Sequence, residues 1–403
     1  MDHNYTMKYL YLKANNAVRE FSNIDSRSPS PGGTEEFLAH FLMVASGNPA
    51  LVISLHSMPD HDEQMQVENL CIQSLALKPH KTSALMRRLP KQVQLFLLGL
   101  QIFVHILRFR PNRVLCWARF FPYWFCCLAS FIVGAEVVLS RHVRFSAPAD
   151  PWYRRAIGSI DAFFARRAHA VLVHGPYLRA DSLAWNIAAE RIVEFDCIYP
   201  QGSAWDPVPK EVSGSKADFF PEHVQTVLFL GRVEACKGVF ELYQACLPLM
   251  YSSKELHLVF AGQGRDMRRL EEAVGHNGLQ ERVRFLGRID HSALPTLIRS
   301  AYCLVAPTRS SFPEGRCMAA MEGLVGGKPV IAPNFGPFPY LVQDTINGLL
   351  YEPDCVDSLR QSLQRILGDP ELYHVLCRGA HATGERLRLN TFGYYHALKS
   401  VWL

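Results

Sequence analysis

The sequence has eleven cysteines in 403 residues, but no two of them stand at the Cys-x-x-Cys spacing of a zinc or redox site. Their odd number and scattered positions favour reduced thiols in a cytosolic setting over a disulfide framework or a metal site. The first residues, MDHNYTMKYLYLK, contain Asp2 and no apolar h-region, so we expect no secretory signal. A hydrophobic content of 49% and a charged content of 20% exclude a disordered chain and allow two globular domains.

Acidic residues are absent between Glu68 and Glu136. Residues 1–205 carry 21 basic and 16 acidic side chains, whereas residues 206–403 carry 21 of each, so the net charge of +5 belongs to the first half. No nucleic-acid-binding motif accompanies this charge, and we therefore expect no nucleic-acid partner. The basic residues of the acid-free window are Lys78, Lys81, Arg87, Arg88, Lys91, Arg108, Arg110, Arg113 and Arg119.

Long apolar runs are few. The run at 93–107 is too short to span a bilayer. A second run, 120–139, is interrupted by a proline, a glycine and a glutamate, and we interpret it as a loop end, a core helix and a buried strand. Two interpretations of this basic, apolar window stay open. Residues 78–125 form either a peripheral surface for anionic lipid or a buried core with a basic rim.

Strand and helix patterns alternate regularly after residue 222, which predicts a parallel sheet with helices on both faces. The first half is similar, beginning with a strand at 7–13 and a glycine turn that enters a helix at 31–45. Strands are predicted at 50–57, 113–118, 136–142, 170–175, 226–233, 256–264, 283–287 and 302–307, and helices at 238–250, 291–301 and 357–367.

The segment 200–222 is rich in proline, glycine, serine and charge, and is the best linker candidate. We therefore predict a first domain at 1–205 and a second at 206–385. A closing amphipathic helix within 386–403 is expected to pack back on the first domain. Two doubly wound domains bind ligands at the carboxyl ends of their strands, so we expect a cleft there.

Charged residues follow the predicted strands of the second domain. Arg232 comes directly after a strand, and Lys237 stands where the next helix begins. Glu314 lies in a loop before a short helix, and Glu322 lies about two turns into that helix. A diphosphate suits the cations and a helix N-terminus, whereas carboxylates suit the hydroxyl groups of sugar or ribose.

These motifs resemble those of a known family. The order G-R-x4-K-G (231–238), FAGQG (260–264), VRFLGRID (283–290) and E-x7-E (314–322) is similar to that in retaining glycosyltransferases of the GT-B type, glycosyltransferase family four, also called glycosyl transferases group one. The resemblance implies an α/β fold of two doubly wound Rossmann-like domains facing a central cleft. The first would bind the acceptor and the second the nucleotide sugar.

The resemblance also implies roles for single residues. Glu314 would touch the donor sugar, Glu322 would hold the ribose hydroxyls, and Arg232 and Lys237 would bind the diphosphate. His142 either borders the donor sugar or is an ordinary core or loop histidine. The glycines that the resemblance places in the donor site are Gly32, Gly33, Gly231, Gly262 and Gly264.

The sequence departs from the family pattern at two places. Arg316 and Cys317 stand where an aromatic residue and a glycine are usual, and our hypothesis is that Arg316 meets an anionic group on donor or acceptor. Residues 336–340, GPFPY, replace a Gly-Gly turn and a later glutamate.

The activity implied is transfer of a sugar from a UDP- or GDP-linked donor to a hydroxyl of a glycan or lipid-linked acceptor, with retention of anomeric configuration. We expect no metal or other cofactor, and a role in cell-envelope or surface glycan synthesis. We expect a cytoplasmic enzyme, peripheral on the inner face of the membrane if residues 78–125 bind lipid. The alternatives are a non-catalytic nucleotide-sugar-binding protein on a degenerate scaffold, a sugar-nucleotide epimerase, or a phosphorylase.

Overall fold

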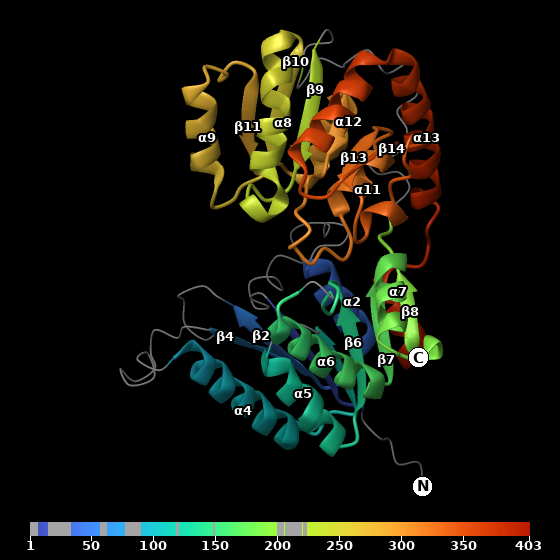
Figure 1. Ribbon diagram of the computed structural model, residues 1–403. Coiled ribbons are helices and arrows are strands. Elements are labelled where there is room, and N and C mark those ends of the chain that lie inside the picture. Colours follow the sequence, from blue (N-terminus) through green and yellow to red (C-terminus); the bar gives the residue numbers. More distant parts are fainter. Residues whose placement is uncertain are drawn as a thin grey trace. The chain divides into compact units, whose positions relative to one another are not determined.

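The computed structural model describes residues 7–14, 34–56, 63–76, 90–117, 121–147, 150–199, 205, 220 and 224–403 (Figure 1). The chain divides into two compact units, the first made of Met1–Cys197 with Phe392–Leu403 and the second of Ile198–Thr391. The division falls at 197/198 and 391/392 rather than at the predicted 205/206 and 385/386. Two packing facts explain the shift. Trp205 is buried against Tyr199 and His291 of the second unit, and helix α13 continues unbroken to Arg388.

The first unit contains an eight-stranded sheet of order β3-β4-β2-β1-β5-β6-β7-β8. Neighbouring strands are parallel except β3 and β4, which form an antiparallel pair at the edge. The central strands are rich in Val, Leu and Ile and are buried on both faces, as parallel strands between helices must be. The strands are β1 (Tyr9–Ala14), β2 (Ala50–His56), β3 (Glu63–Val67), β4 (Leu70–Ala76), β5 (Arg113–Trp117), β6 (Glu136–Arg141), β7 (Ala170–His174) and β8 (Ile192–Phe195).

Helices cover both faces of this sheet. On one face α4, α5 and α6 lie side by side, and the core between them and the sheet contains Ile102, Cys126 and Ala165 (Figure 1). On the other face α2 contributes Phe37 and Phe41 to a second core. The helices of this unit are α2 (Thr34–Ala45), α4 (Lys91–Phe109), α5 (Phe121–Ile132), α6 (Trp152–Arg167), α7 (Pro176–Ala184) and α14 (Tyr394–Trp402).

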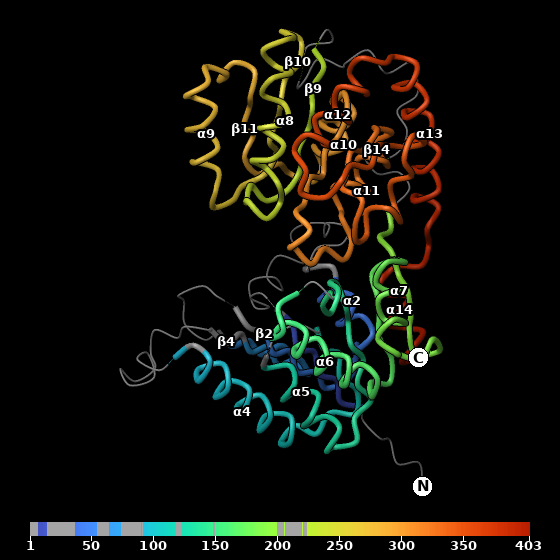
Figure 2. Tube along the Cα trace, viewed as in Figure 1, coloured from blue at the N-terminus to red at the C-terminus, as the bar shows by residue number. Residues whose placement is uncertain are grey.

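The last helix, α14, belongs to the first unit although almost two hundred residues of the second precede it (Figure 2). It packs against α2 and β8 and buries Tyr394, Leu398 and Trp402. The Trp402 ring meets Tyr9 of β1 edge-on at 5.7 Å. Both ends of the described chain therefore contribute to one core.

The second unit contains a six-stranded sheet of order β11-β10-β9-β12-β13-β14, parallel throughout. Its strands are β9 (Gln225–Leu230), β10 (Leu256–Ala261), β11 (Val283–Gly287), β12 (Cys303–Val305), β13 (Val330–Pro333) and β14 (Gly348–Tyr351). Its α-helices are α8 (Val239–Ser252), α9 (Met267–His276), α10 (Leu294–Ser300), α11 (Met318–Val325), α12 (Val356–Gly368) and α13 (Pro370–Arg388). The strands and helices predicted after residue 222 are all present, with ends that shift by a few residues.

Two features of the first unit differ from the sequence-based expectation. The hairpin of β3 and β4 was missed because its first strand, EQMQV, is mostly polar and pairs on one side only. The apolar run 93–107 lies inside a helix of 19 residues. Among the described residues one helical window, Gln92–Phe109, is long and apolar enough to cross a membrane, so the length argument against spanning was wrong.

Candidate functional site

The loops that follow β9, β10 and β12 lie close together because two glycines permit it. Gly262 has a φ of +140°, and a Cβ there would lie 1.8 Å from the carbonyl oxygen of Gly231. Gly238 has a φ of +73° and would clash with the carbonyl oxygen of Pro307 at 1.7 Å. Any side chain at either position would push the loops apart. The carboxyl ends of these strands therefore form one compact edge, which carries the site.

Lys237 and Glu314, which are 77 residues apart in the sequence, meet at this edge. The Lys237 Nζ donates a hydrogen bond to the Glu314 Oε2 at 2.5 Å, and the two side chains are 17% and 11% exposed. The Lys237 ammonium also lies 4.0 Å from the centre of the Phe312 ring. Thr308 donates a longer hydrogen bond, 3.5 Å, to the same carboxylate oxygen. The cation predicted to bind the diphosphate and the carboxylate predicted to contact the donor sugar are thus held side by side.

Arg232 follows β9 and projects further into solvent. Its guanidinium donates to the Glu234 carboxylate at 2.8 Å and lies 5.8 Å from the Phe312 ring centre. Phe312 therefore has two cations near its ring, Arg232 and Lys237. Sequence reasoning did not single out this phenylalanine, because nothing in the SSFPEG stretch distinguishes it from an ordinary loop aromatic.

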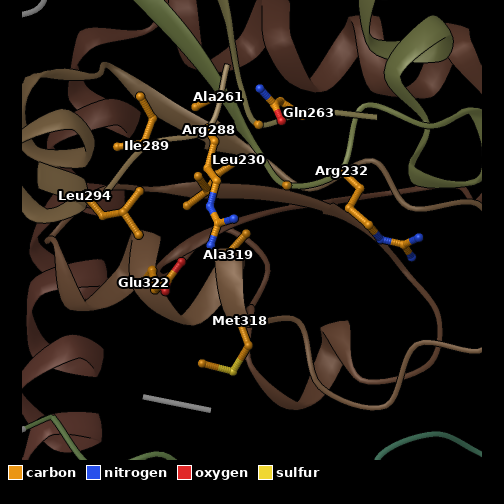
Figure 3. A pocket seen from close by; sticks show the side chains of 12 residues that line it. Leu230, Arg232, Ala261, Gln263, Arg288, Ile289, Leu294, Met318, Ala319 and Glu322 are labelled. Carbon is orange, nitrogen blue, oxygen red and sulfur yellow. The ribbon is translucent and has the colours of Figure 1, made fainter. Parts of the chain in front are cut away.

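Glu322 lies in α11 and is buried at the wall of a pocket with a volume of about 410 Å³ (Figure 3). Burial raises the pKa of its carboxyl group from 4.5 to about 8. At neutral pH the group is therefore largely protonated in the ligand-free protein, and can donate as well as accept a hydrogen bond. Residues from the ends of β9, β10 and β11 and from α10 and α11 line the pocket, namely Leu230, Gly231, Arg232, Ala261, Gly262, Gln263, Arg288, Ile289, Leu294, Met318, Ala319 and Glu322.

Arg288 is a pocket residue that the sequence analysis noted only as following a strand. Figure 3 shows its side chain extending into the same space as Glu322 and Ala319, whereas Arg232 lies at the opposite end. Its sequence context, a strand followed by Gly-Arg, repeats that of Gly231 and Arg232, and this repetition is the signal that could have identified it. The pocket thus has two cationic side chains, Arg288 and Arg232.

The glycines predicted to bind donor fall into two groups. Gly231 and Gly262 line the pocket, but their N–H groups already donate to the carbonyls of Ala261 and Gly287 at 2.9 and 2.7 Å. They shape the wall rather than supply free donors. Gly264 packs its α-carbon against the backbone of Val233 and does not line the pocket. Gly32 and Gly33 lie outside the described residues.

Arg316 and Cys317, the two departures from the family pattern, are both buried in the turn that leads into α11. Burial raises the pKa of the Cys317 thiol to about 12, which makes it an unreactive thiol at neutral pH. Arg316 follows Glu314 by two residues, so a buried cation lies in the loop that carries this carboxylate. The hypothesis that Arg316 meets an anionic group of the donor or acceptor stays a prediction.

Asp266, at the start of α9, holds the loop that carries Lys237. Its carboxylate accepts the N–H of Ala235 at 2.8 Å and pairs with Arg269 at 3.2 Å. The hydrogen bond from the Ala235 N–H is the largest cause that lowers the pKa of Asp266. The sequence analysis missed this residue, since an aspartate at a helix start is common as a cap.

His142 lies in the first unit, directly after β6. Its Nε2 is 2.8 Å from the Ser140 hydroxyl, and its ring packs on Phe37 and Trp117 with centres 4.7 Å away. Burial, and to a smaller degree the charge of His174, lower its pKa to about 3. The imidazole is therefore neutral at physiological pH and has a hydrogen-bond partner within the unit.

Among the described residues one group of side chains has the composition of a metal site. His174, Asp196 and Cys197 place their ligand atoms within 4.8 Å of one another. The His174 Nε2 is 3.3 Å from the Asp196 Oδ1 and 3.5 Å from the Cys197 sulfur, and its ring stacks on Phe195. Both contacts fall on the Nε2 atom of the histidine.

Comparison with known proteins identifies the second unit. The sequence model of the family described as Glycosyl transferases group 1 matches residues 215–382. The chain is 28% identical over 154 residues to the alpha-D-kanosaminyltransferase of Streptomyces kanamyceticus, covering 38% of this chain and 39% of the relative. It is 31% identical over 156 residues to a phosphatidyl-myo-inositol mannosyltransferase of Mycolicibacterium smegmatis, covering 38% and 39%. The matches thus span about two fifths of these relatives.

Solved structures match the whole chain. A complex of Anabaena Alr3699/HepE with UDP has a TM-score of 0.65 at 17% identity and covers 98% of both chains. An E. coli structure bound with UDP-2-fluoro glucose has a TM-score of 0.67 at 14% identity, covering 98% of this chain and 99% of the other. At such identities the match shows the fold alone, which confirms the predicted pair of Rossmann-like domains. Residues 215–382 of the second unit are thus similar to the family of glycosyl transferases group 1, and the chain has the GT-B fold.

Proposed function

We propose that this protein is a glycosyltransferase that moves a sugar from a nucleotide diphosphate sugar to an acceptor hydroxyl. One observation carries the proposal. The Lys237–Glu314 ion pair and the pocket that contains Glu322 both lie beside the strand ends of the second unit, a domain whose sequence matches the model of glycosyl transferases group 1. Two relatives of that domain are named as transferases of kanosamine and mannose. The UDP and UDP-sugar in fold neighbours make UDP the first donor nucleotide to try, before GDP.

In the proposed complex the diphosphate lies between Arg232 and Lys237. Both cations face carboxylates in the ligand-free protein, Glu234 and Glu314 respectively. As the bond from sugar to phosphate breaks, negative charge grows on the departing oxygen, and preorganised cations stabilise it most where water is excluded. Lys237 is the better placed of the two, because it is the more buried. These side chains could neutralise the charge without a resident metal.

Glu314 would contact the donor sugar, and Glu322 the ribose. A protonated Glu322 in a buried wall can donate one hydrogen bond to a ribose hydroxyl and accept another. Glu314, held by Lys237, stays oriented at the junction of sugar and diphosphate. We further propose retention of configuration, with the departing phosphate accepting the proton of the attacking hydroxyl. Neutral His142 would then act as a hydrogen-bonding neighbour of the sugar rather than as an acid.

The acceptor is proposed to be a glycan or a lipid-linked sugar of the cell envelope. Support comes from the acid-free, apolar window in the first unit, of which residues 90–117 and 121–125 are described. The corresponding location is the cytoplasm, with peripheral contact with the membrane.

The test of the activity is acceptor-dependent nucleotide release. UDP-glucose, UDP-N-acetylglucosamine and GDP-mannose would each be incubated with a panel of alkyl glycosides and lipid-extract acceptors, and released nucleotide would be measured. We expect release above the hydrolysis background with one donor, and an anomeric coupling in the product equal to that of the donor. Release that never depends on an acceptor would refute the proposed transfer, and an inverted product would refute retention.

A further inference from the structure

Helix α4 is apolar on two opposite sides. Its inner side buries Ile102 and Ile106 in the core of the first unit. Its outer side presents a stripe spaced at three and four residues, made of Val93, Phe96, Leu100 and Val104, whose side chains are 40–45% exposed. A helix that is apolar all round belongs in a core or in lipid. In this structure the outer stripe of α4 is exposed and does not pack into the core.

The packing of α4 on α5 decides between spanning a bilayer and lying on one. A Cβ at Gly99 would lie 2.4 Å from the Phe125 ring, so the two helices touch where Gly99 leaves no side chain. Phe96 meets Phe125 edge-on at 5.4 Å. Because α5 and the core of the first unit hold its inner side in this way, α4 cannot cross a membrane without unfolding that core. It can only present its outer stripe.

The neighbouring helices extend the stripe into a surface. Leu128 and Ile132 of α5 and Trp152, Ile157 and Phe163 of α6 are exposed, and Trp152 is exposed to 80%. Figure 1 shows α4, α5 and α6 side by side on the same face of the sheet. We call the outward side of these three helices the α4–α6 surface. Exposed apolar areas of this extent mark binding sites for proteins or membranes.

The charge of the α4–α6 surface has one sign. Helix α6 carries Arg154, Arg155, Arg166 and Arg167, while its one acid, Asp161, is buried and accepts hydrogen bonds from Tyr123 and Trp124. Helices α4 and α5 contain no acid. Arg154 has a long contact, 3.9 Å, with Asp150, which precedes the helix.

We propose that the α4–α6 surface docks on an anionic lipid bilayer, with its helices parallel to the membrane plane. Apolar and aromatic side chains would enter the boundary between headgroups and acyl chains, and the arginines would meet lipid phosphates. A symmetric dimer through this surface is disfavoured, because it would bring the arginines of two copies together with no exposed acid of α4, α5 or α6 between them. The inference rests on the proposed function in one respect, since it places that transferase beside a lipid-linked acceptor.

The experiment is flotation of the purified full chain with vesicles of phosphatidylcholine alone and of phosphatidylcholine with one quarter phosphatidylglycerol. We expect binding only to the anionic vesicles, weakened by added salt. Arg155→Gln and Arg167→Gln should each weaken it about fivefold, the factor equivalent to about 1 kcal/mol per cation near the surface. Trp152→Ser with Ile157→Ser should abolish it. Matched controls in the second unit are Arg268→Gln and Leu389→Ser, whose side chains are 89% and 73% exposed.

Three outcomes would overturn the inference. The first is no binding to either vesicle, and the second is equal binding to both that ignores the arginine variants. The third is a dimer in sedimentation velocity that the Trp152 and Ile157 double variant dissociates. Thermal stabilisation by UDP-glucose, measured without vesicles on the same preparations, should be unchanged in every variant. A wild type that binds UDP-glucose but not anionic vesicles refutes the surface alone, and a wild type that binds anionic vesicles but not UDP-glucose refutes the donor site alone.

Discussion

Replacing Lys237 by methionine separates a catalytic from a structural role for its contact with Glu314. Methionine keeps most of the side-chain volume beside Phe312 but removes the charge that is 2.5 Å from the Glu314 carboxylate. Both partners are largely but not fully buried. The loss of stability should therefore lie between the cost for an exposed pair, about 0–1 kcal/mol, and that for a buried pair, about 3–5 kcal/mol.

The effect on turnover should be larger. If Lys237 stabilises charge on the departing phosphate, its loss should lower kcat by about 10²–10³, the effect of removing one preorganised donor. A stability loss of about 2 kcal/mol would lower the Tm of a unit this size by about 4–8 °C. The assays are initial rates at saturating donor and a melting curve of the same preparation, both well below the Tm. Lys237→Arg should recover part of the rate.

Arg388→Met is the matched control. Arg388 is 14% exposed and contacts Glu385 at 2.6 Å, so it resembles Lys237 in burial and pairing, but it stands at the end of α13 and not in a loop that follows a strand. This variant should lose stability and keep its rate. If Lys237→Met also keeps its rate within about threefold while its Tm falls, the lysine is structural and the proposed phosphate role is refuted.

Three further predictions concern single side chains of the second unit. Because burial raises the Glu322 pKa to about 8, the folded state resists its ionisation, and the wild type should lose stability relative to Glu322→Gln as the pH rises from about 4.5 to 8. Paired melting curves across that range should diverge by up to about 3 kcal/mol at pH 7, and parallel curves would contradict the shift. Asp266→Asn weakens the hydrogen bond that holds the Lys237 loop, so donor KM should rise about tenfold with a stability loss of about 1–2 kcal/mol. An unchanged KM would mean that Asp266 only stabilises the start of α9. Arg316→Ala should lower kcat/KM by about tenfold or more for acceptors that carry a carboxylate or phosphate, or for donors whose sugar moiety carries one, and should spare acceptors and donor sugars without one; equal losses on both classes in competition assays would remove the proposed anion contact.

The sequence predicted the second unit well because its signals are local. Apolar runs such as 226–230, bounded by glycines, specify parallel strands, and the residues after each strand necessarily meet at one edge. Contacts that depend on side-chain geometry could not be predicted from the sequence. Nothing in the local sequence pairs Lys237 with Glu314, brings two cations to the Phe312 ring, or shows that the close Gly231 carbonyl requires a glycine at 262.

In the first unit the limits were of a different kind. The polar strand β3 shows little of the alternation of apolar and polar residues that predicts a strand. The burial of α4 on one side only could not be predicted, because the helix is also apolar on its exposed side. The domain boundary was also displaced, since the burial of Trp205 depends on partners nearly a hundred residues away.

The most direct test of the central claim is thermal stabilisation by a panel of UDP-, GDP- and ADP-sugars, with Glu322→Ala as the control. A donor present at a hundred times its dissociation constant should add about 2.7 kcal/mol to the unfolding free energy. The account predicts stabilisation by one nucleotide class, UDP first, and its loss in the Glu322 variant. Melting curves that no nucleotide sugar moves would contradict the donor site and favour a non-catalytic protein on this scaffold.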